Sequence, residues 1–298
     1  GVYTSENGGQ TWNTSNDGPS SVRVRELFWY DQTTLVAATF GRGMFRATVS
    51  AGAALNYSDL WWGGTSENGW GMTVQQHGNL QFNVFFVYDG NGKPVWYVMP
   101  GCTWSSDFTV CNGQLYKPTG SPLNTYNPAQ FAAGAVAGSV TLNYTSASTA
   151  TLQYVINGVA GQKSIQRQVF GAIDNTSGLK VGDMWWGGSN QNGWGVSITQ
   201  QYRTLFAAWY TYDLGGNVTW FTMPGGAWSG NTYSGVIAAT TSSPWIGVPY
   251  NAAQFAAGVV GNVSFAFSDA NNAIMTYSFT GGPFAGTTQS RPIVRQPY

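Results

Sequence analysis

Charged residues are scarce in this chain: Asp, Glu, Lys and Arg make up 8% of its 298 residues, against about 25% in typical soluble domains. Twelve basic and twelve acidic residues give a formal net charge of zero, which argues against nucleic acid or an anionic membrane as a partner. No apolar run reaches about 18 residues, so no membrane insertion is expected. A signal peptide is also missing, as in the mature form of a secreted protein.

Glycine, Ser, Thr and Asn take the place of charge, with 40 glycines, and aromatic residues reach 15%. This composition favours β-structure at a surface or outside the cell, because a cytosolic enzyme usually carries more Lys and Glu. We therefore expect a secreted, extracellular or cell-surface protein.

One long motif occurs twice. Residues 59–71 read Asp-Leu-Trp-Trp-Gly-Gly-Thr-Ser-Glu-Asn-Gly-Trp-Gly, and residues 183–195 read Asp-Met-Trp-Trp-Gly-Gly-Ser-Asn-Gln-Asn-Gly-Trp-Gly. The offset of 124 (61 to 185, 70 to 194) recurs at Ala-Gln-Phe-Ala-Ala-Gly in 129–134 and 253–258. A duplication in register predicts two copies of one folding unit. A residue that both units need should occur in both.

The two cysteines, Cys102 and Cys111, flank a predicted turn, and the offset of 124 places Gly226 and Gly235 opposite them. Joint loss or gain is what a disulfide predicts, because one half alone has no use. A disulfide would indicate an oxidising compartment, and the alternative is a pair of buried free thiols. His77, the single histidine, lies elsewhere in the sequence. We expect no metal site and no cofactor.

Within each unit the short-period patterns are typical of strands. A hairpin is predicted at 80–99, with a Gly-rich turn after Asp89, and again at 204–223. Further strands are expected at 136–144, 149–156 and 163–170, and one helical turn at 128–133. Seven or eight short antiparallel strands fit a β-barrel or a β-sandwich, and the short connections favour the barrel.

The fold class is therefore all-β, with two duplicated antiparallel units at 57–172 and 181–298. Linkers are expected at 48–56 and 171–180, where small and polar residues replace the strand patterns. Residues 1–48 belong to neither unit.

Within 1–48, Ser5-Glu6-Asn7-Gly8-Gly9-Gln10-Thr11-Trp12 resembles the Asp-box, or BNR repeat, of sialidase-type β-propellers, with Asn7 in place of Asp. Residues 35–46 resemble the closing strands of a last propeller blade. The resemblance implies a folding turn on the blade rim and no active-site residue. One blade cannot bury its own faces, so we expect it to pack on the first unit, a neighbouring chain or missing upstream blades. Its expected strands are 2–4, 22–30, 35–39 and 43–49.

The rest of the chain, 57–298, resembles tandem Trp-rich C-terminal repeats of secreted bacterial proteins. The resemblance lies in Trp-Trp, Asn-Gly-Trp-Gly, the Tyr-Asp-x-x-Gly hairpin and the closing segment 165–170. It implies secretion and a β-fold, and the group has no established activity.

The two copies do not share the residues that familiar catalytic mechanisms need. A glycosidase needs two carboxylates a few ångströms apart, but Glu67 is replaced by Gln191 at the offset of 124. The recurring acids are Asp59 with Asp183, at strand starts, and Asp89 with Asp213, in turns where Asp bonds the backbone. No phosphate loop or calcium-loop spacing is present. We expect no enzyme activity.

The recurring tryptophans are the remaining signal. Neighbours such as Trp61 and Trp62 point to opposite faces of a strand, and strand 80–88 also carries aromatics on both faces. These rings cannot all lie inside one small barrel, so some must be exposed or covered by another surface. Exposed rings beside Asn, Gln and Thr bind flat sugar rings. The candidate ligand-binding residues are Trp62, Glu67, Trp96, Trp186 and Trp220.

The leading hypothesis is a non-catalytic recognition or adhesion protein that binds polysaccharide or a cell-surface polymer through exposed aromatics. One alternative is a structural subunit of an extracellular fibre or surface layer, which would bind copies of itself. The other is an accessory C-terminal fragment of a propeller glycoside hydrolase.

Overall fold

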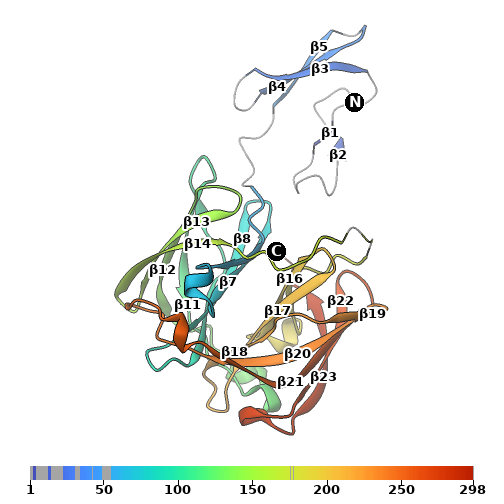
Figure 1. Ribbon diagram of the computed structural model, residues 1–298. Helices are drawn as coiled ribbons and strands as arrows, with labels where there is room; N and C mark the ends of the chain where they lie inside the picture. Colours follow the sequence, from blue (N-terminus) through green and yellow to red (C-terminus); the bar gives the residue numbers. More distant parts are fainter. Residues whose placement is uncertain are drawn as a thin grey trace.

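The computed structural model describes residues 3–4, 13–14, 23–30, 34–41, 43–48, 55–174, 176 and 178–297. The chain is all-β, as predicted, and its strands are joined by turns and short 3-10 helices (Figure 1). Within the described residues, no helix has the length and apolar character needed to cross a membrane. The 3-10 helices are η1 (Thr65–Glu67), η2 (Leu123–Thr125), η3 (Pro128–Gln130), η4 (Ser189–Gln191), η5 (Ala252–Gln254) and η6 (Gly282–Phe284).

The first unit is a closed barrel of eight antiparallel strands in sequence order. The sheet closes on itself where Tyr116 pairs with Val98. This closure confirms the barrel, which the short connections favoured over a sandwich. β10 (Thr103–Trp104) attaches to one strand outside the closed ring. The ring is β6 (Asp59–Trp62), β7 (Gly71–His77), β8 (Leu80–Tyr88), β9 (Pro94–Met99), β11 (Val110–Tyr116), β12 (Val136–Tyr144), β13 (Thr149–Ile156) and β14 (Val159–Arg167).

The second unit repeats this barrel, closed by the pair Thr222 and Ala238. β19 (Ala227–Ser229) takes the place of β10. The ring is β15 (Asp183–Trp186), β16 (Gly195–Gln201), β17 (Thr204–Tyr212), β18 (Val218–Met223), β20 (Thr232–Thr241), β21 (Ala256–Phe267), β22 (Asn272–Phe279) and β23 (Thr288–Arg295).

Both predicted hairpins and the helical turn are confirmed, but one predicted strand is misplaced. The strand expected at 163–170 runs over Val159–Arg167. Its hairpin turn is Asn157-Gly158, where φ is 50° and 80°. Asn-Gly is the pair best suited to a two-residue turn with positive φ at both positions.

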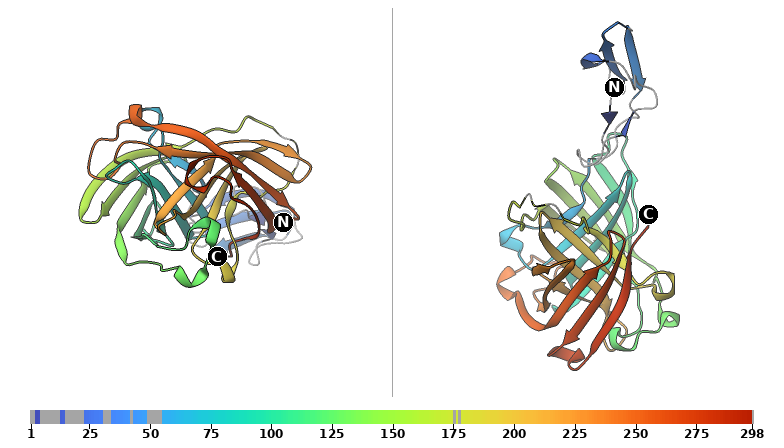
Figure 2. Two further views of the ribbon diagram at one scale, coloured as in Figure 1. Left: turned by 90° about the horizontal axis from the view of Figure 1, so that it is seen from below. Right: turned by 90° about the vertical axis from the view of Figure 1, so that its right-hand side faces the viewer.

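The two barrels lie against each other (Figure 2). The aromatic residues on both strand faces are covered, because the second face of β8 and β9 packs on the other barrel. Trp96 Nε1 donates to the carbonyl of Thr211 at 3.0 Å, and Trp220 Nε1 donates to the carbonyl of Val87 at 3.1 Å. These are one contact seen twice with the roles of the barrels exchanged. The barrels therefore meet through an isologous interface, as two subunits of a symmetric dimer do.

Cys102 and Cys111 form the predicted disulfide and clamp β10 to β11. The counterpart predicted for Cys111 is wrong. Trp104 pairs with Cys111 in the first barrel, and Trp228 pairs with Tyr233 in the second. The second hairpin is two residues shorter, so a buried Tyr233 replaces Cys111.

Replacing both cysteines by serine should cost somewhat under about 3 kcal/mol, because the disulfide closes only a short loop in the unfolded chain. Urea unfolding of Cys102→Ser/Cys111→Ser measures the loss. Thiol labelling of the native, unreduced protein should find no free thiol. Labelling at both positions would contradict the disulfide.

The N-terminal part forms two small sheets. β3, β4 and β5 make a three-stranded antiparallel sheet, and β1 pairs with β2. The Asp-box segment 5–12 lies outside the described residues. Leu27 and Phe28, on opposite faces of β3, are both exposed, so each face of this sheet carries an exposed apolar side chain among the residues that the structure describes. The strands are β1 (Tyr3–Thr4), β2 (Asn13–Thr14), β3 (Val24–Trp29), β4 (Thr34–Thr39) and β5 (Met44–Thr48).

Candidate functional site

Each barrel closes one opening of the other with a long loop. The loop before β12 reaches the second barrel, where Tyr126 donates its hydroxyl proton to the carbonyl of Asn192 at 2.8 Å. The loop before β21 reaches the first barrel, where Tyr250 donates to the carbonyl of Asn68 at 2.9 Å. We call the two closed openings the first mouth and the second mouth, after the barrel that each belongs to.

The first mouth is filled by an indole ring from the other barrel. Trp245 is 0% exposed and stacks on Tyr154 with ring centroids 4.7 Å apart. It also meets Trp70 edge to face at 5.1 Å. The duplicated chain thus supplies the central plug of the first barrel from the second.

An ion pair lies beside this plug. Lys163 Nζ contacts the two carboxylate oxygens of Glu67 at 3.0 and 2.9 Å, and Trp70 Nε1 donates to the same carboxylate at 3.1 Å. The ammonium lies 5.4 to 5.9 Å from the ring centres of Trp70, Trp245 and Tyr250. Burial raises the pKa of Tyr250, although its hydrogen bond to Ser242 opposes the shift. Glu67, predicted to contact a ligand, pairs with the buried ammonium of Lys163.

The second mouth has the same layout with different residues. Leu123 takes the place of Trp245, Gln191 that of Glu67, and Arg291 that of Lys163. Arg291 Nη1 donates to Gln191 Oε1 at 3.1 Å, and Nη2 donates to the carbonyl of Leu123 at 3.0 Å. The guanidinium therefore ties the plug to the barrel wall through neutral acceptors.

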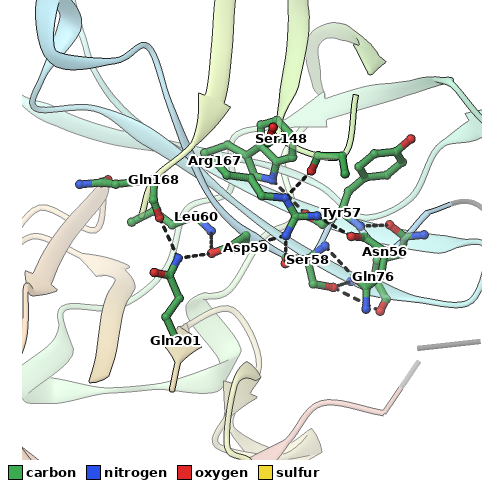
Figure 3. A network of polar contacts seen from close by, with 12 residues as sticks. Asn56, Tyr57, Ser58, Asp59, Leu60, Gln76, Ser148, Arg167, Gln168 and Gln201 are labelled. Atoms are coloured by element: carbon green, nitrogen blue, oxygen red, sulfur yellow. Dashed lines mark hydrogen bonds and ion pairs between the residues drawn. The ribbon is translucent and has the colours of Figure 1, made fainter. Parts of the chain in front are cut away.

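Two further ion pairs close the barrels and join them. Arg167 Nη1 on the last strand of the first barrel contacts Asp59 Oδ2 at 3.2 Å, and Gln201 of the second barrel donates to Asp59 at 2.9 Å (Figure 3). In the second barrel Arg295 contacts Asp183 at 3.0 Å, and His77 of the first barrel contacts the same carboxylate. Asp59 and Asp183, the recurring acids at the strand starts, therefore each close one barrel and contact the other.

The turn role predicted for the other recurring acids is confirmed. Asp89 Oδ1 accepts hydrogen bonds from the backbone of Asn91 and Lys93 at 2.8 and 2.9 Å. Asp213 accepts from Gly215 and Asn217, both at 2.9 Å. Each recurring carboxylate thus has a structural partner.

The predicted tryptophan platform is not on the surface. Trp96 and Trp220 are only 5% and 1% exposed, because each lies between the barrels. Neither offers a ring face to a ligand, so the prediction that they are exposed is wrong. Trp62 and Trp186 are half-buried, and the indole N–H of Trp186 is buried without a hydrogen-bond partner among the described residues.

One outer wall of each barrel carries a groove lined by uncharged side chains. A groove of about 510 Å³ crosses β12, β13 and β14 of the first barrel, and one of about 410 Å³ crosses β20, β21 and β22 of the second. No side chain that lines either groove is charged. The side chains that project into them are Ser139, Thr141, Gln153, Val155, Ala160 and Gln162 in the first, and Ser234, Val236, Asn262, Ser264, Thr276 and Ser278 in the second.

Sequence reasoning missed the basic residues of these sites. They are Lys163 and Arg291 at the mouths, and Arg167 and Arg295 on the strands that close the barrels. At the offset of 124, Arg167 is matched with Arg291, whereas strand pairing matches it with Arg295: Arg167 pairs with Trp61 and Arg295 with Trp185. The true offset on the last strand is 128 (167 to 295, 163 to 291). Both final strands carry an arginine, Arg167 and Arg295. Aligning the two copies on this arginine would also have matched Lys163 with Arg291.

A comparison with protein-family models, curated proteins and solved structures found no match to this chain. The residues that the structure describes contain no cluster of three or more His, Cys, Asp or Glu side chains that could hold a metal ion.

Proposed function

We propose that this chain is a non-catalytic extracellular recognition protein that binds a neutral polymer, such as a cell-surface polysaccharide, along the outer walls of its barrels. The disulfide is compatible with such a location. The polymer contacts the polar outer walls, because Trp96 and Trp220 are buried between the barrels.

The pair of uncharged grooves carries the proposal. Four wall positions are equivalent in the two barrels by strand pairing: Ser139 with Asn262, Thr141 with Ser264, Gln153 with Thr276, and Val155 with Ser278. Hydroxyl and amide side chains donate and accept, as sugar hydroxyls do. A neutral wall also binds a neutral polymer without removing a charge from water.

The rigid arrangement of the barrels supports tandem binding. Two grooves on one body raise the effective concentration of the second contact once the first has formed. A long polymer is therefore held better than its short fragments, even where each groove binds weakly.

Arginine in the grooves should weaken binding to insoluble neutral polysaccharide. Ser139→Arg and Asn262→Arg place a long charged side chain in each groove, and the double variant should lose at least about tenfold in affinity, or about 1.4 kcal/mol. Pull-down with cellulose, chitin and β-glucan, at constant ionic strength, measures it.

The matched control is Asn143→Arg with Ala266→Arg, because both positions are exposed on the same strands and lie outside the grooves. The control should bind like the native chain. Equal binding by all variants, or no binding by the native protein to any of these polymers, would reject the outer walls as the site.

A second candidate function is assembly, and the N-terminal sheet favours it. The apolar residues Leu27, Phe28 and Met44 are exposed, and a small open sheet is marginal in water. A neighbouring copy would cover these faces in a fibre or surface layer. Upstream blades would cover them equally well if the chain is the accessory part of a propeller protein.

Hydrogen exchange on residues 23–48 separates these alternatives. If copies cover the sheet, protection should be weak in dilute monomer and rise as the protein is concentrated, because association is concentration-dependent. Strong protection that does not change with concentration would count against assembly. No protection at any concentration would show that neither a second copy nor the rest of this chain covers the sheet.

A further inference from the structure

The groove of the first barrel lies on the side that faces away from the second barrel. In a closed ring of eight strands, strands four places apart lie on opposite sides of the barrel. Thr73 of β7, Phe86 of β8 and Trp96 of β9 each contact the second barrel. Four places along the ring from these strands are β12, β13 and β14, which carry the groove. The groove is therefore opposite the interface.

The second barrel repeats this arrangement. Ser197 of β16, Tyr210 of β17 and Trp220 of β18 contact the first barrel. The strands four places along are β21, β22 and β23, and the second groove crosses β20, β21 and β22. Figure 1 shows β12 and β13 on the left side of the pair of barrels and β22 on the right side. An isologous interface relates equivalent surfaces by a two-fold axis, so the two grooves face away from each other.

Contacts at both ends of the barrels keep the grooves in these positions. At the mouths, Tyr126 and Tyr250 each donate to a backbone carbonyl of the other barrel. At the opposite end, Gln201 and His77 each contact a carboxylate of the other barrel. Turning one barrel about the interface would break bonds at both ends. The grooves therefore cannot swing round to the same side of the molecule.

Two grooves that face away from each other cannot both lie on one straight polymer. A flexible chain can fold back to the second groove, but a stiff chain or the face of a particle occupies one groove only. The other groove then stays open to a second chain. That chain can have the same chemistry as the first, because hydroxyl and amide side chains line both grooves and no lining side chain is charged.

We propose that this protein cross-links neutral polysaccharide: each groove binds a different chain or particle, and the pair of barrels holds the two together. The inference rests on the proposed function, because it takes the grooves as the polymer sites. It adds a physical role to that binding, since a molecule with one groove would coat a polysaccharide surface and a molecule with two opposed grooves joins two surfaces.

Clumping of dispersed cellulose, chitin or β-glucan particles, followed by light scattering, tests the proposal. The native protein should clump the particles that it binds, most strongly at intermediate concentration, because in excess protein each binding position on a particle carries its own molecule. Ser139→Arg alone and Asn262→Arg alone each block one groove. Each variant should still pellet with the particles but lose the clumping. An equal mixture of the two should not clump either.

The matched control, Asn143→Arg with Ala266→Arg, should clump the particles like the native chain. No binding by the native protein would overturn the proposed function, and cross-linking with it. Native protein that binds without clumping would overturn cross-linking alone. So would loss of all binding in one single-groove variant, which would leave only one site. Clumping by the single-groove variants equal to that of the native chain would also overturn it, because self-association would then join the particles.

Discussion

Replacing Trp245 by alanine is expected to lower the free energy of unfolding by about 3–5 kcal/mol, the usual cost of removing a fully buried tryptophan. Its ring contacts Trp70 and Tyr154 of the first barrel, although its own loop belongs to the second. The loss should therefore appear in the first barrel. Urea unfolding followed by circular dichroism gives the size of the loss, and hydrogen exchange shows whether β12–β14 lose protection.

Leu123→Ala is the matched variant at the second mouth. Leucine truncations cost about 2–5 kcal/mol, and this one should fall below Trp245→Ala because a smaller side chain is removed. Its lost protection should lie in the second barrel. A loss below about 1 kcal/mol for Trp245→Ala, or protection lost only around residue 245 itself, would contradict the exchange of plugs.

The strands could be read from the sequence because their signals are local. The side chains of 80–88 alternate between two faces, and Asp89 begins a turn that binds its own backbone. The closed barrel followed from the short connections between such strands. Trp70, Met72 and Val74, placed on one core-facing side, are all buried in the hydrophobic core of the first barrel.

The site could not be read in the same way, because it depends on contacts between the copies. Trp96 and Trp220 are of the residue type that sugar-binding surfaces use. No local sequence pattern shows that the indole N–H of each donates to the backbone of the other barrel. The exchange of Trp245 for Leu123 was hidden by a two-residue difference in loop length. A constant offset can align strands, but it loses register in loops and misassigns their side chains.

The two barrels also explain why the chain contains so little charge. Isologous packing buries one wall of each barrel, and Asp59 and Asp183 each contact side chains of both barrels. Any unpaired charge there would be costly to bury. Glutamine, serine and threonine fill the rest: Gln75 donates to Ser197 at 2.8 Å, and the hydroxyls of Thr73 and Tyr210 lie 2.9 Å apart.

Asp183→Asn is expected to cost about 3–5 kcal/mol, the range for breaking a buried ion pair by removing one partner. Asp183 is 3% exposed and holds Arg295 and His77 at 3.0 Å, together with the backbone N–H of Met184 at 2.8 Å. Asparagine keeps the shape but leaves the guanidinium without its counter-charge. The effect should exceed that of Asp59→Asn, because the side chain of Asp59 is 16% exposed and its inter-barrel partner, Gln201, is neutral.

His77→Gln separates the contribution of the ion pair from that of the inter-barrel bond. Glutamine copies Gln201, its counterpart at the offset of 124, so it can still donate to Asp183 without charge. Because the side chain of His77 is 44% exposed, this variant should change stability by less than about 1 kcal/mol. Urea unfolding of the three variants gives the order Asp183→Asn, Asp59→Asn, His77→Gln. A loss for His77→Gln as large as for Asp183→Asn would place the stabilisation in the contact between the barrels and not in the closure of the second barrel by Arg295.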